Sequence, residues 1–462
     1  MSSPCIATAS PIFSGDHKNV HDIQSIRTPQ DDDNNIIRVQ DCDRSHAGSS
    51  VYAYFNILCC ICGVGMLGLP QSLQKGGWSA LLLLILSWWM TLYCSIILIR
   101  SLYLSRCHDN QKIPLRLVSM PAIAKEAFGK VGGYITFFFQ TLITFGLATL
   151  HFILAGANMN KLCEGTVAQI GQVSWTIVIC ILVAFPYIFL KSMKDTGWTS
   201  IFGALAILTT AVICVIVAGI DQQTRYSHQE EHPENTMLPA ITHHTILWQT
   251  YPAALSNISV SFSGNVTFPT IEAAMNKPHQ WSRVITTGLS TAALFYIMIA
   301  TAGYSIYGDT VQNPVYYSLP EGIPRIVCTV LITIAVTASI PIYLMALTLE
   351  CEEMMGITVE RRGRFYEFIL RAGFRSFTVF LCGLIGCTVP YFDLLMALFG
   401  AFGCSTTVYL IPVLCYWRLS GFRNKPFYEL AWNFLILVFG LMGLVFGTWF
   451  AMEDLIRAYQ HV

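Results

Sequence analysis

The stretch Cys59–Pro70, CCICGVGMLGLP, lies inside the first long apolar segment of the chain. It contains three glycines, Gly63, Gly65 and Gly68, and ends on a proline. In a helix interior, glycine costs about 1 kcal/mol and proline about 3 kcal/mol relative to alanine, so the stretch predicts a broken helix. Inside a bilayer, such a break leaves backbone N–H and C=O groups unpaired. It is tolerated only where it lines a cavity or is buried in protein.

Two interpretations of this break remain open at this point. Transporters hold zwitterions and ions with backbone groups freed in this way, so residues 59–66 would form half of a substrate site. Alternatively, the run GVGMLG is a small-residue face for close packing between helices.

The composition indicates the class of protein. Of the 462 residues, 54% are hydrophobic and 12% are charged, and the mean hydropathy is +0.54. A soluble domain has roughly 25% charged residues. We therefore expect an all-α polytopic membrane protein in a lipid bilayer. The formal net charge is zero, which gives no basic surface for nucleic acid.

The cysteines do not indicate metal or disulfide chemistry. Most of the sixteen lie in apolar segments, where they behave as small apolar residues. Cys59, Cys60 and Cys62 are too closely spaced along one helix for a zinc site, and only Cys163 falls in a predicted non-cytosolic loop. We expect no cofactor. The sequence offers no recognisable nucleophile–base pair or phosphate loop, so we do not expect an enzyme.

Eleven apolar segments have the length needed to span a membrane. They lie near 51–74, 78–104, 131–157, 173–190, 197–219, 246–270, 284–306, 324–348, 371–389, 392–417 and 430–452. We expect a transmembrane domain over 51–454 and a short non-cytosolic tail over 455–462. Residues 1–50 are polar, and we expect a disordered cytosolic tail without a cleaved signal peptide.

The basic residues predict the orientation of the chain. With a cytosolic N-terminus, 22 of the 27 Lys and Arg residues fall on the cytosolic side, as the positive-inside rule requires. The remaining five are Lys75, Lys161, Arg225, Arg325 and Arg457. This orientation places the C-terminus on the luminal or extracellular side.

Two connecting segments carry further signals. The segment 220–245 is the longest non-cytosolic loop, and its histidines suit either a solvated loop, which we favour, or a metal site. These histidines are His228, His232, His243 and His244. In the cytosolic loop, Ser119–Gly129 has apolar residues at helical spacing and predicts a short helix at the membrane interface.

A second break is predicted in segment six, at Val260–Pro269, VSFSGNVTFP. Gly264 and Pro269 interrupt the apolar run, as the glycines and Pro70 do in segment one. Because the two segments are five spans apart, an odd number, the second set of five would be inverted relative to the first. Inverted repeats whose broken first helices meet at the midplane are a transporter architecture.

Several motifs resemble the amino acid/auxin permease family. They are YFNI (54–57) leading into GVGMLGLP and QKGGW (74–78), EAFGKVGGY (126–134), DTGWTSIFGALA (195–206), SFSGNVTFPTIEAAMNKP (261–278) and YSIYGD (304–309). The resemblance covers about 51–450 and is greatest for the fungal vacuolar and vesicular-transporter-like branch. It implies a LeuT-like core of two inverted five-helix repeats plus one extra helix, carrying amino acids by alternating access.

The resemblance also implies a substrate site. Its residues would be Cys60, Ile61, Cys62, Gly63, Val64 and Gly65 of helix one, and Ser261, Phe262, Ser263, Gly264 and Asn265 of helix six. Unwound carbonyls suit an ammonium group, and a half-helix N-terminus suits a carboxylate. Many relatives carry histidine at the position of Asn265, so no proton role is expected there.

Candidates for ion coupling or gating follow from polar groups within spans. Glu272 either relays a proton, gates the inner mouth or pairs with a loop cation. For His151 we favour a satisfied interior histidine over a coupling role. Thr333, Thr337 and Ser339 of helix eight are available to sodium. The branch resembled favours proton coupling, and sodium remains the alternative.

Two further questions stay open. A membrane amino acid sensor with the same fold and little flux is the alternative to a transporter. The resemblance favours a vacuolar or other endomembrane location, with the plasma membrane as the alternative.

Overall fold

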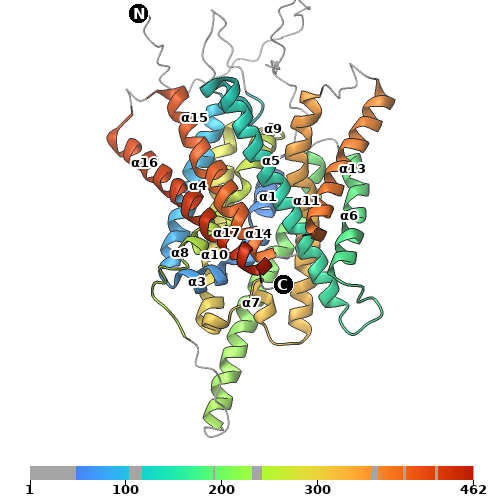
Figure 1. Cartoon of the computed structure of the whole chain (residues 1–462), viewed down its shortest axis with the longest axis vertical. Helices are drawn as coiled ribbons and strands as arrows, with labels where there is room; N and C mark the ends of the chain where they lie inside the picture. Colours follow the sequence, from blue (N-terminus) through green and yellow to red (C-terminus); the bar gives the residue numbers. More distant parts are fainter. Residues whose placement is uncertain are drawn as a thin grey trace, which may run out of the picture. The chain divides into compact units, whose positions relative to one another are not determined.

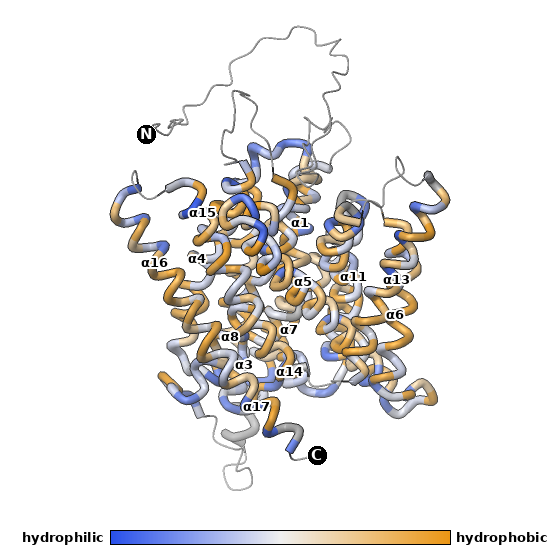
Figure 2. Tube along the Cα trace, turned by 45° about the horizontal axis from the view of Figure 1, so that its top comes forward, coloured by the Kyte–Doolittle hydropathy of each residue, from blue (hydrophilic) through white to orange (hydrophobic). Residues whose placement is uncertain are grey.

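The computed structural model describes residues 48–103, 117–190, 193–231, 242–355, 363–388, 392–421 and 425–460. Within these ranges the regular structure is helical, apart from one isolated β-bridge between Gly48 and Met275. Figure 1 shows the long helices running alongside one another. In Figure 2 their middle portions are mainly hydrophobic, and hydrophilic residues concentrate toward the two ends.

Among the described residues, nine helical segments are long and apolar enough to cross a membrane. In chain order they are α4 (Ser79–Leu102), α5 (Met120–Leu162), α6 (Gln172–Phe189), α7 (Gly197–Glu231), α10 (Trp281–Tyr307), α11 (Ile323–Met354), α13 (Arg364–Thr388), the run α14 (Phe392–Leu398), η7 (Phe399–Leu410) and α15 (Ile411–Ser420), and the run α16 (Phe427–Met442), η8 (Gly443–Gly447) and α17 (Thr448–Gln460).

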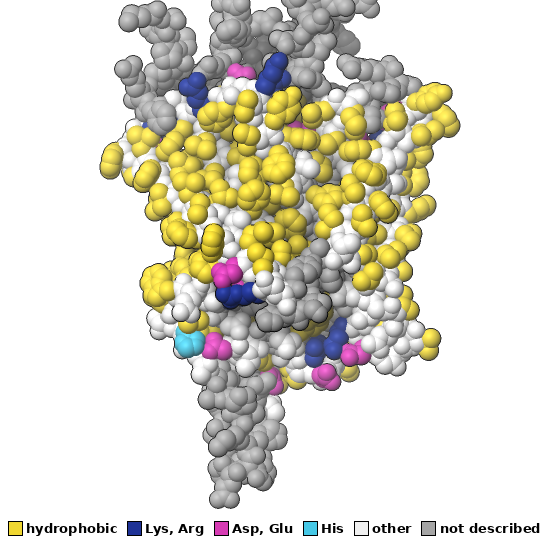
Figure 3. Space-filling model, in the orientation of Figure 1, with side chains coloured by type: hydrophobic (Ala, Val, Ile, Leu, Met, Phe, Trp, Pro, Cys, Tyr) yellow, Lys and Arg dark blue, Asp and Glu magenta, His cyan; other side chains and the backbone are white. Residues whose placement is uncertain are grey.

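The outer surface has the polarity of a protein that faces lipid. Large apolar side chains such as Leu82, Phe185 and Trp449 are about 70% exposed. Figure 3 shows hydrophobic side chains across the middle of one face, with charged side chains above and below them. A surface of this kind is stable only against hydrocarbon. The prediction of an all-helical polytopic membrane protein is therefore confirmed.

The first and sixth predicted segments are broken, and the breaks lie where glycine and proline interrupt the apolar runs. Segment one consists of α1 (Ser50–Ile61), α2 (Val64–Leu67) and α3 (Leu69–Gly76). Segment six consists of α8 (Tyr251–Ser261), a 3₁₀ turn η3 (Ser263–Thr267) and α9 (Phe268–Ala273). The two segments contact each other, and α3 lies beside α8 (Figure 1).

The helices differ from the predicted segments in three places. The interface helix predicted at Ser119–Gly129 joins span three as α5, with a kink at Gly129, whose φ of 77° is in the left-handed region. Helix α7 continues to Glu231, so the predicted loop 220–245 begins as helix. Helix α17 continues to Gln460, past residue 454. Hydrophobicity reports how much of a helix lies in lipid, whereas good helix formers such as Gln and Glu extend it into water.

A buried ion pair joins the three helices α6, α11 and α13. The guanidinium of Arg375 on α13 is fully buried and donates to both carboxylate oxygens of Glu352 on α11, at 2.7 and 3.1 Å. It also donates to the backbone carbonyl of Tyr187 on α6, at 3.0 Å. This bidentate pair fixes the register of α11 and α13.

Candidate functional site

The two breaks meet through their glycines. A Cβ atom placed on Gly65 would lie 2.4 Å from the Cα of Ser261, and one placed on Gly264 would lie 2.9 Å from Cγ1 of Ile61. Non-bonded carbon atoms do not approach this closely, so only glycine permits the backbones to come together here. The structure thus brings together the two stretches that were predicted to share a substrate site.

Buried hydroxyl groups contact the carbonyl oxygens around the break in segment one. Tyr343 of α11 donates a hydrogen bond to the carbonyl of Cys60. The Tyr296 hydroxyl of α10 lies 2.5 Å from the carbonyl oxygen of Ile61 and 2.6 Å from that of Ser261. Its single hydrogen can form a full hydrogen bond with only one of these carbonyls at a time. Because the hydroxyl lies within hydrogen-bond distance of both, Tyr296 bridges the two breaks. Ser339 Oγ is 3.1 Å from the carbonyl oxygen of Cys59.

The sequence interpretation did not identify Tyr296 and Tyr343 as site residues. Both are tyrosines in the middle of apolar spans, and both side chains are buried. A buried phenol needs a hydrogen-bond partner, and in a membrane the free carbonyls of a broken helix are suitable partners. This reasoning makes both tyrosines candidates, but it does not distinguish them from other buried tyrosines such as Tyr409.

In segment six, the predicted polar side chains bond largely within their own helix. Ser261 Oγ donates to the carbonyl of Asn257 at 3.1 Å, and Ser263 Oγ donates to that of Val260 at 2.6 Å. The ring of Phe262 lies 5.2 Å from that of Tyr296. At Ser261 both the backbone and the hydroxyl face segment one, because Oγ would lie 2.8 Å from a Cβ atom placed on Gly65.

Asn265 makes its side-chain contacts with other helices. Its Oδ1 accepts a hydrogen bond from Ser95 of α4 at 3.0 Å, and its amide nitrogen donates to the carbonyl of Val408 in η7 at 3.4 Å. Both contacts are buried. Asn265 thus connects segment six to α4 and η7, and its amide is not directed at the break in segment one.

His151 lies beside the break in segment one. Its Nδ1 is 2.6 Å from the carbonyl oxygen of Leu147, and its ring is 5.2 Å from that of Tyr343. Its Nε2 would be 2.9 Å from a Cβ atom placed on Gly63. The side chain is 1% exposed, and Nε2 has no hydrogen-bond partner among the described residues. The prediction of a satisfied interior histidine therefore holds for Nδ1 and is wrong for Nε2.

The other coupling candidates lie in different surroundings. Thr333 and Thr337 direct their hydroxyls to carbonyls one turn back on α11, each at 2.6 Å. Glu272 is fully buried in α9 and accepts a hydrogen bond from the Tyr103 hydroxyl at 2.6 Å. The eighth predicted span is α11. Of its hydroxyls that were considered for sodium, that of Ser339 contacts segment one.

The loop histidines form separate pairs. His243 Nε2 lies 3.1 Å from the carbonyl oxygen of Tyr304, and His244 Nε2 lies 3.2 Å from Asp309 Oδ2. The part of the chain that the structure describes contains no cluster of three or more potential metal ligands. His232 and the side chain of His228 lie outside the described part.

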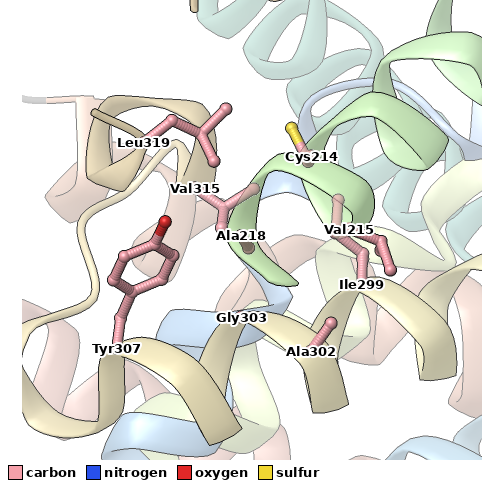
Figure 4. A pocket seen from close by; sticks show the side chains of 9 residues that line it. All are labelled: Cys214, Val215, Ala218, Ile299, Ala302, Gly303, Tyr307, Val315 and Leu319. Carbon is pink, nitrogen blue, oxygen red and sulfur yellow. The ribbon is translucent and has the colours of Figure 1, made fainter. Parts of the chain in front are cut away.

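A small apolar cavity lies between α7, α10 and η6 (Val315–Ser318) (Figure 4). Its volume of about 10 Å³ is at the lower limit for a single water molecule. Its walls include Cys214, Ala218, Ile299, Gly303, Val315 and Leu319. The residues that meet at the two breaks are not among its lining residues, so it is not the predicted site.

Comparisons with solved structures identify the fold. The chain is similar to a Na⁺-coupled sialic acid symporter in a substrate-bound, outward-open state, with a TM-score of 0.56 and 12% identity over 90% of this chain and 92% of the symporter. It is also similar to Mhp1, a nucleobase-cation-symport-1 family transporter, in a closed conformation, with a TM-score of 0.50 and 11% identity over 90% and 94% of the two chains. Both likenesses indicate a LeuT-like fold.

Sequence comparisons identify the family. Amino acid transporter AVT1I of Arabidopsis thaliana is 25% identical over 424 residues, which cover 90% of this chain and 98% of the relative. Amino acid transporter AVT1C of the same plant is 23% identical over 418 residues, which cover 89% and 70%. The model of the family described as "Transmembrane amino acid transporter protein" matches residues 46–453. The chain therefore belongs to this family of membrane transporters, which are not enzymes.

Proposed function

We propose that this protein is a proton-coupled secondary active transporter that carries amino acids by alternating access. The approach of Gly65 to Ser261 is the observation that supports this proposal most directly, because it joins two helix breaks within the membrane. The proposal includes eleven spans, the nine long helices plus the two broken segments. Ten of them would form two inverted repeats of five, with one span added.

The substrate would bind between the breaks. The carbonyls of Cys60, Ile61 and Ser261 are suited to the ammonium group of an amino acid, and backbone N–H groups of residues 63–65 are suited to its carboxylate. In the present conformation, tyrosine hydroxyls contact these three carbonyls. Tyr296 and Tyr343 would then exchange these contacts for the substrate, holding the carbonyls in place when the site is empty.

Proton coupling is favoured over sodium by the branch of the family that the motifs resemble. Sodium would need carbonyl and hydroxyl oxygens that direct their lone pairs at a shared centre. Here the Tyr343 hydroxyl donates to the carbonyl of Cys60, while the hydroxyls of Thr333 and Thr337 donate within α11. The hydroxyls of Thr333 and Thr337 give up their hydrogens and keep their lone pairs, so sodium stays the alternative that the transport assay tests.

Orientation and location form part of the proposal. The distribution of Lys and Arg supports a cytosolic N-terminus and a luminal C-terminus. Glu272 and Tyr103 would then meet at the cytosolic end of the transport path, where their hydrogen bond would contribute to an inner gate. The family resemblance of the motifs supports a vacuolar or other endomembrane location.

Transport by the purified protein in proteoliposomes tests the proposal. The vesicles would receive a mixture of the twenty amino acids under an imposed pH gradient, and then under a sodium gradient. We expect accumulation that follows the pH gradient and persists without sodium. Accumulation driven by sodium alone would contradict proton coupling. Measurable amino acid binding without accumulation under either gradient would indicate a sensor. Protein-free vesicles provide the background.

A further inference from the structure

His151 has one ring nitrogen satisfied and one directed at the helix break. The carbonyl of Leu147 can only accept a hydrogen bond, so Nδ1, which lies 2.6 Å away, carries a hydrogen. This contact fixes the tautomer of the neutral ring. Nε2 then presents a lone pair beside Gly63, and it becomes an N–H donor only when the ring takes up a second proton.

Among the residues that the structure describes, no charged group contacts His151 that would pair with a protonated ring. The ring of Tyr343 of α11 lies beside it at a tilt of 52°, and the thiols of Cys59, Cys60, Cys62 and Cys404 lie around Tyr343. Tyr296 of α10 faces the same break. Within the described part of the chain, the titratable groups found around His151 at the break in segment one are thus phenols and thiols. The site contains a proton acceptor, and the counter-charge would come from a ligand.

We propose that His151 takes up the transported proton on Nε2 and that the resulting imidazolium pairs with the carboxylate of the amino acid in the break of segment one. This inference rests on the proposed function and assigns its coupling to one side chain. The proton comes from water on the more acidic side of the membrane. It leaves to water on the other side, and the ring returns to its neutral tautomer.

The pairing of the imidazolium with the carboxylate gives a physical reason why the proton and the amino acid are transported together. A charge buried without a partner in a membrane protein is strongly disfavoured. A proton on His151 without a carboxylate would leave such a charge near Gly63. A carboxylate beside the unprotonated ring would face the lone pair of Nε2, with no hydrogen between the two acceptors. When both enter, the imidazolium donates to the carboxylate, while the carbonyls of the breaks hold the ammonium group of the amino acid. The conformational change would then occur with both bound or with neither, which is the condition for symport.

The test compares His151→Gln with His279→Gln in proteoliposomes. Glutamine keeps an amide that can donate to a carboxylate, but it does not titrate. His279 lies in η4 (Pro278–Gln280) and is exposed, so it controls for the loss of a histidine. For His151→Gln we expect at least a tenfold loss of accumulation driven by a pH gradient. Exchange of labelled for unlabelled amino acid should persist, because exchange needs no net proton movement.

Calorimetry provides a second measurement. Titration of substrate into the purified protein, in buffers of different ionisation enthalpy, gives the number of protons taken up per substrate bound. Below neutral pH we expect about one for the wild type and for His279→Gln, and none for His151→Gln. Elution volume and thermal midpoint in detergent establish that each variant is folded.

The possible outcomes separate the two proposals. Absence of amino acid transport by the wild type under any gradient would contradict the proposed function itself. Wild-type accumulation together with normal accumulation and proton uptake in His151→Gln would overturn the role of His151 alone. A folded His151→Gln protein that neither binds nor exchanges substrate would also overturn it, because the residue would then serve binding and not the proton.

Discussion

Gly65 and Ser261 approach so closely that a methyl group added to Gly65 would lie 2.4 Å from the Cα atom of Ser261. The two residues come from segments almost two hundred positions apart in the sequence. Their contact brings the free backbone groups of α1 and α8 to one place in the membrane, and the proposed mechanism depends on it.

The first prediction concerns this contact. Gly65→Ala should reduce transport at least tenfold, because the methyl group forces the two breaks apart. Gly219→Ala on α7 is the matched control, since no atom lies within 4 Å of its added Cβ. Initial rates in proteoliposomes, normalised to the folded protein recovered, would measure the effect. Normal transport by Gly65→Ala would exclude a substrate site that requires this approach.

The second prediction concerns the hydroxyl that bridges the breaks. Tyr296→Phe removes the group lying 2.5 Å from the carbonyl of Ile61 and 2.6 Å from that of Ser261. A buried carbonyl left unpaired costs about 1–3 kcal/mol, so the thermal midpoint in detergent should fall. Tyr134→Phe, at a side chain that is 69% exposed, should leave it unchanged. Equal midpoints for both variants would show that the carbonyls need no partner.

The third prediction concerns the buried ion pair. Arg375→Met leaves the carboxylate of Glu352 without its bidentate partner and should destabilise the fold by about 3–5 kcal/mol. The double variant with Glu352→Met should recover much of this loss, because it removes both charges. Arg457→Met, which breaks an exposed pair with Glu453, should cost at most about 1 kcal/mol. Unfolding in detergent measures all three, and a double variant as unstable as the single one would contradict the interpretation.

The fourth prediction concerns pH. Lys425 lies just before α16, with Nζ 3.5 Å from the ring centre of Tyr416 and 3.8 Å from Glu429 Oε1. Burial lowers the pKa of Lys425 from 10.5 to about 8, and Glu429 opposes this shift. Between these two values the unfolded chain binds the proton that the folded protein has lost, so stability contributed by Lys425 rises with pH.

Comparison of the wild type with Lys425→Met isolates the stability that Lys425 contributes. The thermal midpoint of the wild type, relative to that of Lys425→Met, should rise as the pH increases from 8 to 10. Lys130→Met removes a positive charge from an exposed side chain and controls for net charge. A difference between wild type and Lys425→Met that does not vary with pH would show that the ammonium group is fully hydrated.

The sequence was sufficient to predict the class of protein and the positions of both helix breaks. These features depend on local properties, namely the apolar content of each segment and the cost of glycine and proline within it. It also led correctly to the transporter family, because each motif is a continuous stretch of the sequence. The length of α7 was underestimated, since hydropathy does not detect a helix that continues into water.

Only the tertiary structure decided which groups meet. A helix that is apolar on all sides gives no sequence signal for its rotation about its own axis. The sequence therefore could not show that Tyr296 and Tyr343 point at the freed carbonyls, that Asn265 contacts Ser95, or that Nε2 of His151 lies beside Gly63. Those contacts depend on how each helix is rotated and how deeply it packs against its neighbours, which is determined by the side chains of the whole bundle together.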